Sequence, residues 1–326
     1  MPPWIERPAL DFDLDADWDT ITLPAGAIAS ARRLLDAILG EIPSSARFLA
    51  YLVRLRTWGR FQKELGAMAR RAGTDWRDIM LANLSYDLVL GRLGCSTLAL
   101  ATRDGPVLAR NMDWWPEDLL ARASYLLRYR QQGRPRFASA AWPGGVGVVT
   151  GMSERGFALA LNAAISPEGV ARTGYPMLLF LRTVLEDARD FDHALKMCVH
   201  QRLTAPGLIT LVGHANDQRV VVERTPKRSA LRGPDAPGAP LIATNHFRVL
   251  FPPSDGQGLE LNETTCGRFD FLCRRLGDDT GHRALADEEL LYTLSEPDVI
   301  QSITAQHVLI RPAEAKMRLF VPRRLL

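Results

Sequence analysis

The sequence predicts an α+β protein in which helices pack on antiparallel β-sheets. Helical periodicity dominates the first 94 residues, and the pattern changes to strand-like alternation at Cys95. The strands that follow are interrupted by one pair of helices and then resume. With 326 residues, 47% hydrophobic and 24% charged, the chain has a globular composition and can bury a substantial core. These observations favour sheets covered by helical layers.

The N-terminal segment, residues 1–94, is predicted to be mostly helical after an irregular acidic beginning. Apolar residues recur at helical spacing over residues 27–42, 46–71 and 76–90. Thr74 or Asp75 stands where a cap for the third helix is needed.

The segment that begins at Cys95 predicts a β-hairpin followed by further strands. Residues 96–102 alternate between apolar and polar, Asp104-Gly105 is typical of a tight turn, and residues 106–110 form the returning strand. Later strands are predicted over residues 123–130, 145–150, 157–162, 207–213, 219–223, 239–245, 307–311 and 317–322. Later helices are predicted over residues 176–188, 190–200, 266–276 and 287–294.

The hairpin brings Arg110 and Asp113 back beside Cys95, which makes the cysteine a candidate nucleophile. A nearby guanidinium favours the thiolate, the reactive form of the side chain. Each residue also has an ordinary interpretation, because lone cysteines are usually small buried hydrophobes and Arg–Asp pairs are often surface ion pairs. Asn162 and Asn245 could likewise be turn residues at strand ends. Only the joint pattern favours catalysis.

Four stretches together resemble the cysteine N-terminal-nucleophile hydrolases that act on linear amides. They are Asn83–Asp87 upstream of Cys95, Met152–Asn162, Arg172–Pro176 and Thr244–His246. This group includes choloylglycine hydrolases, the acyl-coenzyme A:isopenicillin N acyltransferases and the acid ceramidase-like amidases. The resemblance covers most of residues 80–275. The sequence departs from the ceramidase-like pattern at Asn162, where those amidases usually have a glutamate, and in this it resembles the choloylglycine type.

The resemblance implies a four-layer αββα sandwich and a precursor that cuts itself between Gly94 and Cys95. Residues 1–94 would then be the α chain and residues 95–326 the catalytic β chain, together one compact unit and an α/β heterodimer. The new α-amine of Cys95 would serve as general base, since a free α-amine has a pKa of about 7.7–8.0. A homo-oligomer of this unit is also compatible with the resemblance.

The resemblance also implies roles for the hairpin residues. Cys95 would attack the amide carbonyl and carry the acyl group as a thioester. Arg110 would hold the thiolate, and Asp113 would hold the ammonium form of the α-amine.

Three downstream residues complete the implied site. Asn245 would donate to the oxyanion through its side-chain amide, a contribution worth roughly 3–4 kcal/mol in other enzymes. Asn162 would help hold the α-amine or the tetrahedral intermediate. Arg268 resembles a late arginine that supports such sites.

The implied function is cleavage of a linear N-acyl amide through a Cys95 thioester. The first alternative is an acyltransferase that moves the acyl group from acyl-coenzyme A or an amide to an amine, because both reactions share every step up to the thioester. The second alternative is a non-catalytic scaffold that kept the fold.

Composition sets the remaining expectations. The net charge is only +3 and the arginines are spread along the chain, so neither nucleic acid nor an anionic membrane is implied as a partner. The four cysteines show no disulfide framework, and no secretory signal or bilayer-spanning stretch is recognised, so we expect a cytoplasmic protein. His193, Cys198 and His200 lack the spacing of a helical metal site, and we expect neither metal nor cofactor.

Overall fold

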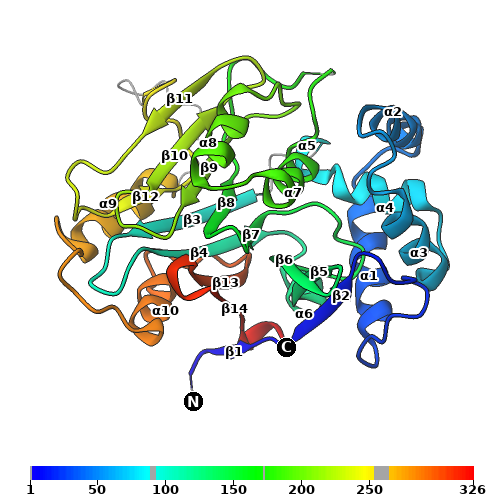
Figure 1. Ribbon diagram of the computed structural model, residues 1–326, viewed down its shortest axis with the longest axis horizontal. Helices are drawn as coiled ribbons and strands as arrows, with labels where there is room; N and C mark the ends of the chain where they lie inside the picture. The colour runs from blue at the N-terminus through cyan, green and yellow to red at the C-terminus, as the bar shows by residue number, and fades with distance from the viewer. Residues whose placement is uncertain (1, 89–92, 172, 253–263) are drawn as a thin grey trace.

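Two β-sheets lie face to face at the centre of the molecule and helices cover their outer faces (Figure 1). The structure is a computed structural model that describes residues 2–88, 93–171, 173–252 and 264–326. The predicted α+β class and the four-layer arrangement of helix, sheet, sheet and helix are confirmed.

The first sheet has six strands, and every neighbouring pair in it is antiparallel. In spatial order the strands are β1 (Trp4–Glu6), β14 (Lys316–Pro322), β13 (Thr304–Arg311), β4 (Val107–Trp114), β3 (Leu93–Leu100) and β12 (Leu241–Ala243).

The second sheet has eight strands and is antiparallel except at one edge, where β2 runs parallel to β5. In spatial order the strands are β11 (Ser229–Arg232), β10 (Arg219–Arg224), β9 (Gly207–Val212), β8 (Phe157–Asn162), β7 (Thr150–Ser153), β6 (Arg134–Ala141), β5 (Tyr125–Gln131) and β2 (Ala9–Asp13).

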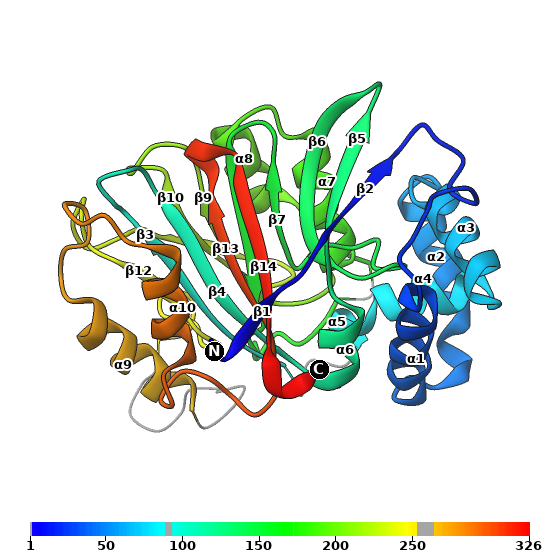
Figure 2. The same cartoon turned by 90° about the horizontal axis from the view of Figure 1, so that it is seen from below.

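The helices fall into three groups around the sheets (Figures 1 and 2). The N-terminal group is α1 (Ala27–Gly40), α2 (Phe48–Arg56), α3 (Gln62–Ala72), α4 (Trp76–Asn83) and α5 (Ser85–Leu88). Helices α7 (Met177–Asp187) and α8 (Phe191–His200) cover the eight-stranded sheet, α9 (Thr265–Leu276) and α10 (Asp287–Ser295) cover the six-stranded sheet, and α6 (Glu117–Ala123) packs against α1. Short 3₁₀ turns occupy Ser44–Arg47, Pro312–Glu314 and Arg323–Leu325.

Small apolar side chains fill the space between the two sheets. Ala99 and Leu108 from the predicted hairpin meet Ala158 and Ala160 of β8, and all four are fully buried. A second apolar cluster, which includes Leu98 and residues of α9 and α10, fills the space behind the six-stranded sheet. Successive side chains of the hairpin therefore point alternately into two hydrophobic cores, one on each face of the six-stranded sheet.

The N-terminal segment is less separate than its helical pattern predicts. Its acidic beginning, expected to be irregular, contains β1 and β2, which form one edge of each sheet. In Figure 2 the dark blue chain crosses from one sheet to the other before it enters α1. Residues 1–88 thus contribute hydrogen-bonded strands as well as helices.

Two further predictions about local structure are wrong, and one strand was not predicted. The predicted helix over residues 46–71 is interrupted between α2 and α3, where Trp58 and Gly59 both have a positive φ. The predicted strand over residues 145–150 is a loop up to residue 149. Gly147 packs so closely on Leu178 of α7 that a Cβ at position 147 would lie 2.6 Å from the leucine Cβ, and this contact holds the loop in place. Strand β6 was not predicted, because its Arg-Pro-Arg beginning lacks a strand pattern.

A buried ion pair joins the N-terminal helices to the rest of the molecule. Arg182 of α7 donates to Glu64 of α3 at 2.7 Å and to Glu186 at 2.6 Å, and its side chain is 1% exposed. Its guanidinium also stacks on the rings of Tyr129 and Phe137.

Replacing Arg182 with methionine should lower the free energy of unfolding by about 3–5 kcal/mol, because the buried carboxylate of Glu64 loses its ion-pair partner, whereas Glu186 keeps Arg60. Urea unfolding measures this loss. Arg128→Met is the matched control, since its ion pair with Asp11 also joins the N-terminal segment to the body but is half exposed, and it should cost less than about 1 kcal/mol. Equal losses in the two variants would contradict this assignment.

Candidate active site

The β3–β4 hairpin places Arg110 on the same face of the sheet as Cys95. The register pairs Cys95 with Met112 and Thr97 with Arg110, so the cysteine and the arginine are diagonal neighbours. Cys95 is 4% exposed and Arg110 is fully buried. The hairpin predicted from the sequence is therefore present, with the arginine beside the thiol.

Arg110 holds the cysteine sulfur against the eight-stranded sheet. Its Nη2 lies 2.6 Å from Cys95 Sγ, while Nη1 donates to Thr150 Oγ1 at 2.9 Å and to the Leu161 carbonyl at 3.0 Å. The guanidinium therefore spans the gap between the two sheets at the point where the nucleophile lies.

Burial outweighs the guanidinium in setting the acidity of the thiol. Desolvation raises the pKa of Cys95, and although the positive charge of Arg110 opposes this shift, the net direction is upward. The hairpin pattern alone had suggested a stabilised thiolate. The upward shift in the pKa of Cys95 favours the neutral thiol over the thiolate.

Asn245 and Arg268 hold the backbone of Cys95. The Cys95 N–H donates to Asn245 Oδ1 at 2.9 Å, and the Cys95 carbonyl accepts from Arg268 Nη1 at 2.6 Å. Arg268 Nη2 also donates to Asn245 Oδ1 at 2.8 Å. Because two donors converge on this oxygen, the orientation of the Asn245 side-chain amide is determined.

The Asn245 amide nitrogen is only partly used by these contacts. Nδ2 donates to the Ala163 carbonyl at 2.8 Å, which takes one of its two hydrogens. The Asn245 backbone N–H donates to Thr265 Oγ1 at 2.8 Å, at the start of α9. The residue is thus held by α9 and by the strand end after β8.

Asp113 lies across the ladder from Gly94, the residue before the nucleophile. Strand alternation directs its side chain to the opposite face from the Cys95 thiol, where Oδ1 accepts from Thr304 Oγ1 at 2.6 Å. Its other oxygen, Oδ2, is buried and has no hydrogen-bond partner among the described residues. Burial also raises the pKa of this carboxyl group.

Asn162 connects strands rather than contacting the nucleophile. Its Oδ1 accepts from Thr97 Oγ1 at 2.6 Å and its Nδ2 donates to the Ala243 carbonyl at 3.0 Å. These bonds join β8 to β3 and β12. Among the described residues, this side chain forms no hydrogen bond with Cys95.

The structure adds polar partners that sequence reasoning missed. The Thr150 hydroxyl accepts from Arg110, and the Thr304 hydroxyl donates to Asp113. The Thr265 hydroxyl accepts from the Asn245 N–H, and Ser96 Oγ accepts from Arg268 Nη1 at 2.8 Å. Ser96 and Thr265 are next to or near expected residues in sequence. Thr304 offers no sequence signal, because it reaches the site only through the pairing of β13 with β4.

Helix α5 brings the end of the N-terminal segment close to the nucleophile. Tyr86 is buried and donates to the Pro206 carbonyl at 2.7 Å. Asp87 accepts from the Met177 N–H at the start of α7 and from Thr204 Oγ1. Residues 89–92, which lead toward Cys95, lie outside the described residues.

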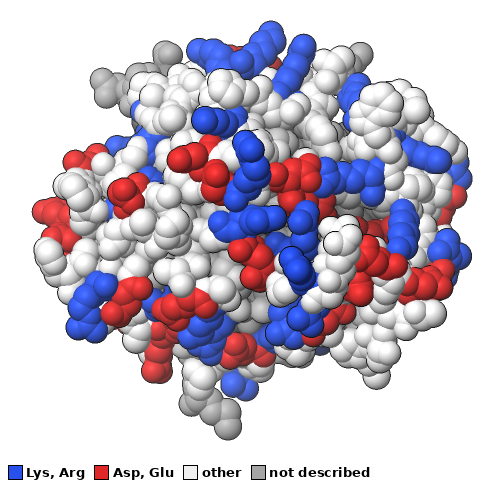
Figure 3. All heavy atoms as spheres, in the orientation of Figure 1, with Lys and Arg blue, Asp and Glu red and all other residues white. Residues whose placement is uncertain are grey.

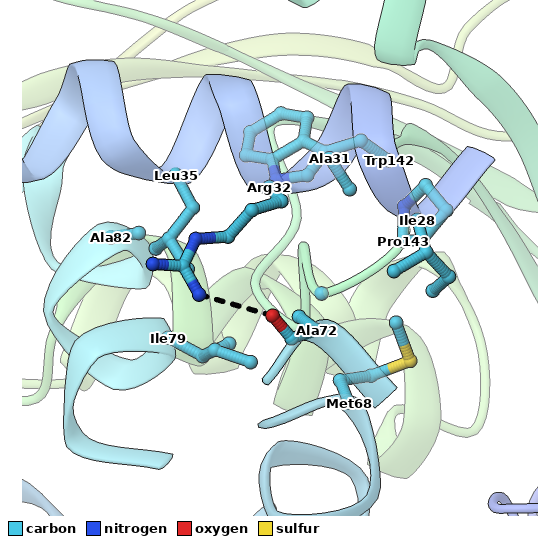
Figure 4. Close-up of a pocket in the computed structure, with 11 residues that line it drawn as sticks. Ile28, Ala31, Arg32, Leu35, Met68, Ala72, Ile79, Ala82, Trp142 and Pro143 are labelled. Atoms are coloured by element: carbon cyan, nitrogen blue, oxygen red, sulfur yellow. Dashed lines mark hydrogen bonds between the residues drawn. The ribbon is translucent and has the colours of Figure 1, made fainter. Parts of the chain in front are cut away.

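An apolar cavity of about 570 Å³ opens beside α5. Its lining includes Phe48, Leu52, Leu84, Leu88, Val170 and Pro176, with Asp87 and Thr204 at its polar end. A second cavity, between α1, α3, α4 and the loop at Trp142, has a volume of only about 20 Å³ (Figure 4). It holds little more than one water molecule. Two other hollows, of about 570 Å³ and about 330 Å³, carry several charged side chains, which include Arg128 and Lys316 in the first and Arg136 and Glu186 in the second. The apolar lining, rather than the volume, makes the cavity beside α5 the candidate site for an apolar group, and Cys95 is not among its lining residues.

Within the described residues, no group of His, Cys, Asp and Glu side chains is arranged to bind a metal, and Cys198 is buried in the core. No helix in the same part of the chain is both long and apolar enough to cross a bilayer. On the face shown in Figure 3, basic and acidic side chains are interspersed.

The fold is that of the N-terminal-nucleophile hydrolases. A solved structure of the Caenorhabditis elegans N-acylethanolamine-hydrolyzing acid amidase ortholog superposes on 67% of this chain and 93% of its own, with a TM-score of 0.54 and 20% identity.

The chain belongs to the family described as acyl-coenzyme A:6-aminopenicillanic acid acyl-transferase, whose model matches residues 100–312. This match includes Arg110, Asp113, Asn162, Asn245 and Arg268 and begins shortly after Cys95. The resemblance inferred from sequence is therefore confirmed.

Two proteins with known names are similar in sequence to this chain. The Emericella nidulans acyl-coenzyme A:6-aminopenicillanic-acid-acyltransferase 40 kDa form is 28% identical over 66% of this chain and 59% of its own length. The Caenorhabditis elegans N-acylethanolamine-hydrolyzing acid amidase is 24% identical over 50% of each chain. The chain thus spans about half to three-fifths of the curated relatives it matches.

Stability should fall as the pH rises from about 4 to about 7, because burial raises the pKa of Asp87 to about 6 from its ordinary value of 3.8. The folded chain binds more protons than the unfolded chain between these values, so this contribution is complete below about pH 4 and is lost as the pH passes 6. The loss is at most about 3 kcal/mol.

Asp87→Asn should flatten this pH profile in urea unfolding, measured with Cys95→Ala present so that the chain stays uncut. The matched control is Asp217→Asn at an exposed aspartate, which should keep the wild-type profile. An unchanged profile in Asp87→Asn would contradict the assignment.

Proposed function

We propose that this protein is a self-processing cysteine amidase that cleaves linear N-acyl amides through a Cys95 thioester. The observation that carries the proposal is the convergence of Arg110 on the cysteine sulfur and of Asn245 and Arg268 on its backbone. Membership of an acyltransferase family and likeness to an amide hydrolase support this class of chemistry.

Self-cleavage would begin with attack of the Cys95 thiol on the carbonyl carbon of Gly94. The Gly94–Cys95 amide bond breaks, the nitrogen takes up the thiol proton, and the Gly94 carbonyl becomes a thioester. Water then releases the Gly94 carboxylate and regenerates the thiol. Both chains would stay together as an α/β heterodimer, since β1 and β2 are paired within the two sheets and Arg182 holds α3.

The new α-amine would supply the base that the buried thiol lacks. Asn245 Oδ1 already accepts from this nitrogen, and the unpartnered oxygen of Asp113 lies behind the cleavage site. An ammonium group there would give the buried carboxylate a counter-charge, which favours both charged forms. The amine has a pKa near neutrality, so it can take the thiol proton and return it to the leaving amine.

Turnover of an amide would follow the same bond changes. The sulfur attacks the amide carbonyl, the second N–H of Asn245 stabilises the oxyanion, and the C–N bond breaks with release of a protonated amine. Water then hydrolyses the thioester to the carboxylic acid. The apolar cavity beside α5 supports an apolar acyl group as the part of the substrate that is recognised.

Acyl transfer is the second candidate function, because the matching family is named for an acyltransferase. It differs only in the last step, where an amine rather than water accepts the acyl group. The site residues are the same for both reactions.

Amine release from acetyl, octanoyl and palmitoyl amides of one amine tests the proposal. Wild type should release amine, fastest with the apolar chains, and acid quenching should trap the acyl group on residues 95–326. Cys95→Ala should do neither.

Octanoyl-coenzyme A with an amine acceptor forms the second arm of this experiment. If a new amide forms only from this donor, acyl transfer is favoured over amide hydrolysis as the function. No acyl group trapped from either donor would contradict the proposed enzyme and favour the scaffold.

A further inference from the structure

Glu223 is a fully buried carboxylate that holds the loop after Asn245. From β10, Oε1 accepts from the Arg248 N–H at 2.8 Å, and Oε2 accepts from the Val249 and Leu250 N–H groups at 2.9 Å each. Three amide donors on one carboxylate are enough to set the path of a short loop.

Arg232 holds the strand that precedes Asn245. From β11, its Nη2 donates to the Ile242 carbonyl at 2.7 Å, and its Nε lies 3.8 Å from Glu223 Oε1. The two side chains are diagonal neighbours across the β10–β11 ladder, since Glu223 pairs with Ala230 and Arg232 with Val221. Strands β10, β11 and β12 lie together in Figure 1.

This ion pair therefore contacts the chain on both sides of Asn245. Arg232 binds the carbonyl three residues before it, and Glu223 binds the N–H groups that start three residues after it. Thr265 of α9 binds Asn245 itself, since its hydroxyl accepts from the Asn245 backbone N–H. Neither member of the pair forms a hydrogen bond with Cys95 in the described chain, so any effect on the thiol must pass through the Asn245 segment.

We infer that Glu223 and Arg232 are positioning residues that set the Asn245 side-chain amide against Cys95. The pair acts on the proposed reaction by keeping the Asn245 oxygen at the nucleophile's nitrogen, and by keeping the amide nitrogen at the oxyanion. A shift of about 1 Å in such a group can cost about 100-fold in rate. The inference rests on the proposed function for its catalytic consequence but not for its geometry.

Hydrogen exchange of the residue-95 amide tests the geometry without any turnover. In a Cys95→Ala background this N–H still donates to Asn245, so Glu223→Gln and Asn245→Ala should each speed its exchange by about 10-fold or more. The double variant should exchange no faster than Asn245→Ala, because both changes remove one contact. The Leu98 amide on the same strand reports on unfolding and should keep its protection.

Glu64→Gln is the matched control, since Glu64 is also a buried carboxylate paired with an arginine but lies in α3. It should change exchange at residue 95 by less than about 2-fold. Unchanged exchange in Glu223→Gln, or effects that add fully to those of Asn245→Ala, would overturn the inference. If Glu223→Gln does not fold, Arg232→Lys is measured in the same way, with the same expected and contradicting results.

Kinetics then measure the catalytic consequence. With Cys95 intact, Glu223→Gln should lower kcat for the amide by about 10–100-fold with little change in KM, while Glu64→Gln should leave kcat near wild type. Wild type that releases no amine refutes the proposed function and leaves the exchange result valid. Active wild type with an unchanged Glu223→Gln kcat refutes the inference alone.

Discussion

The contact of Arg268 with Cys95 and Asn245 is the interaction on which the site depends. This buried guanidinium comes from α9, yet it donates to the Cys95 carbonyl, to Ser96 and to the Asn245 side chain. The Arg268 guanidinium therefore joins α9 to two segments that are distant in sequence, the start of β3 and the loop at Asn245. Without it, two carbonyl oxygens and a hydroxyl would lose a donor in a site closed to water, and an unsatisfied buried acceptor costs about 1–3 kcal/mol.

Burial disfavours charge on the two ionisable side chains at Gly94 and Cys95, the thiol of Cys95 and the carboxyl group of Asp113. Burial raises the pKa of both the Cys95 thiol and the Asp113 carboxyl, so neither is readily charged. Cutting the chain between Gly94 and Cys95, inside β3, would add an ionisable amine at Cys95. Under the proposed function, one new charge would activate the site, without a rearrangement of the sheets.

Sequence patterns predicted the parts of the structure that depend on near neighbours. The hairpin follows from alternation around Asp104-Gly105, and α8 begins where Asp190 caps it. Predictions failed where distant contacts decide the conformation. Gly147 is in a loop because α7 lies against it, and β2 is a strand because β5 provides a partner.

The candidate site shows the same division between local and distant information. Cys95 and Arg110 are adjacent by hairpin geometry, whereas Asn245 and Arg268 were found through resemblance to a family. Glu223 and Arg232 gave no sequence signal, because a buried carboxylate that binds backbone N–H groups has no fixed spacing from the loop it holds.

Intact mass of freshly purified wild type beside Cys95→Ala tests most directly whether Cys95 becomes an N-terminal nucleophile. Scaling 36.2 kDa by chain length, a cut before Cys95 gives pieces of about 10 kDa and about 26 kDa. The account predicts these two masses in wild type and one uncut mass in Cys95→Ala. A single uncut mass in both proteins would leave Cys95 without its amine base and contradict the account.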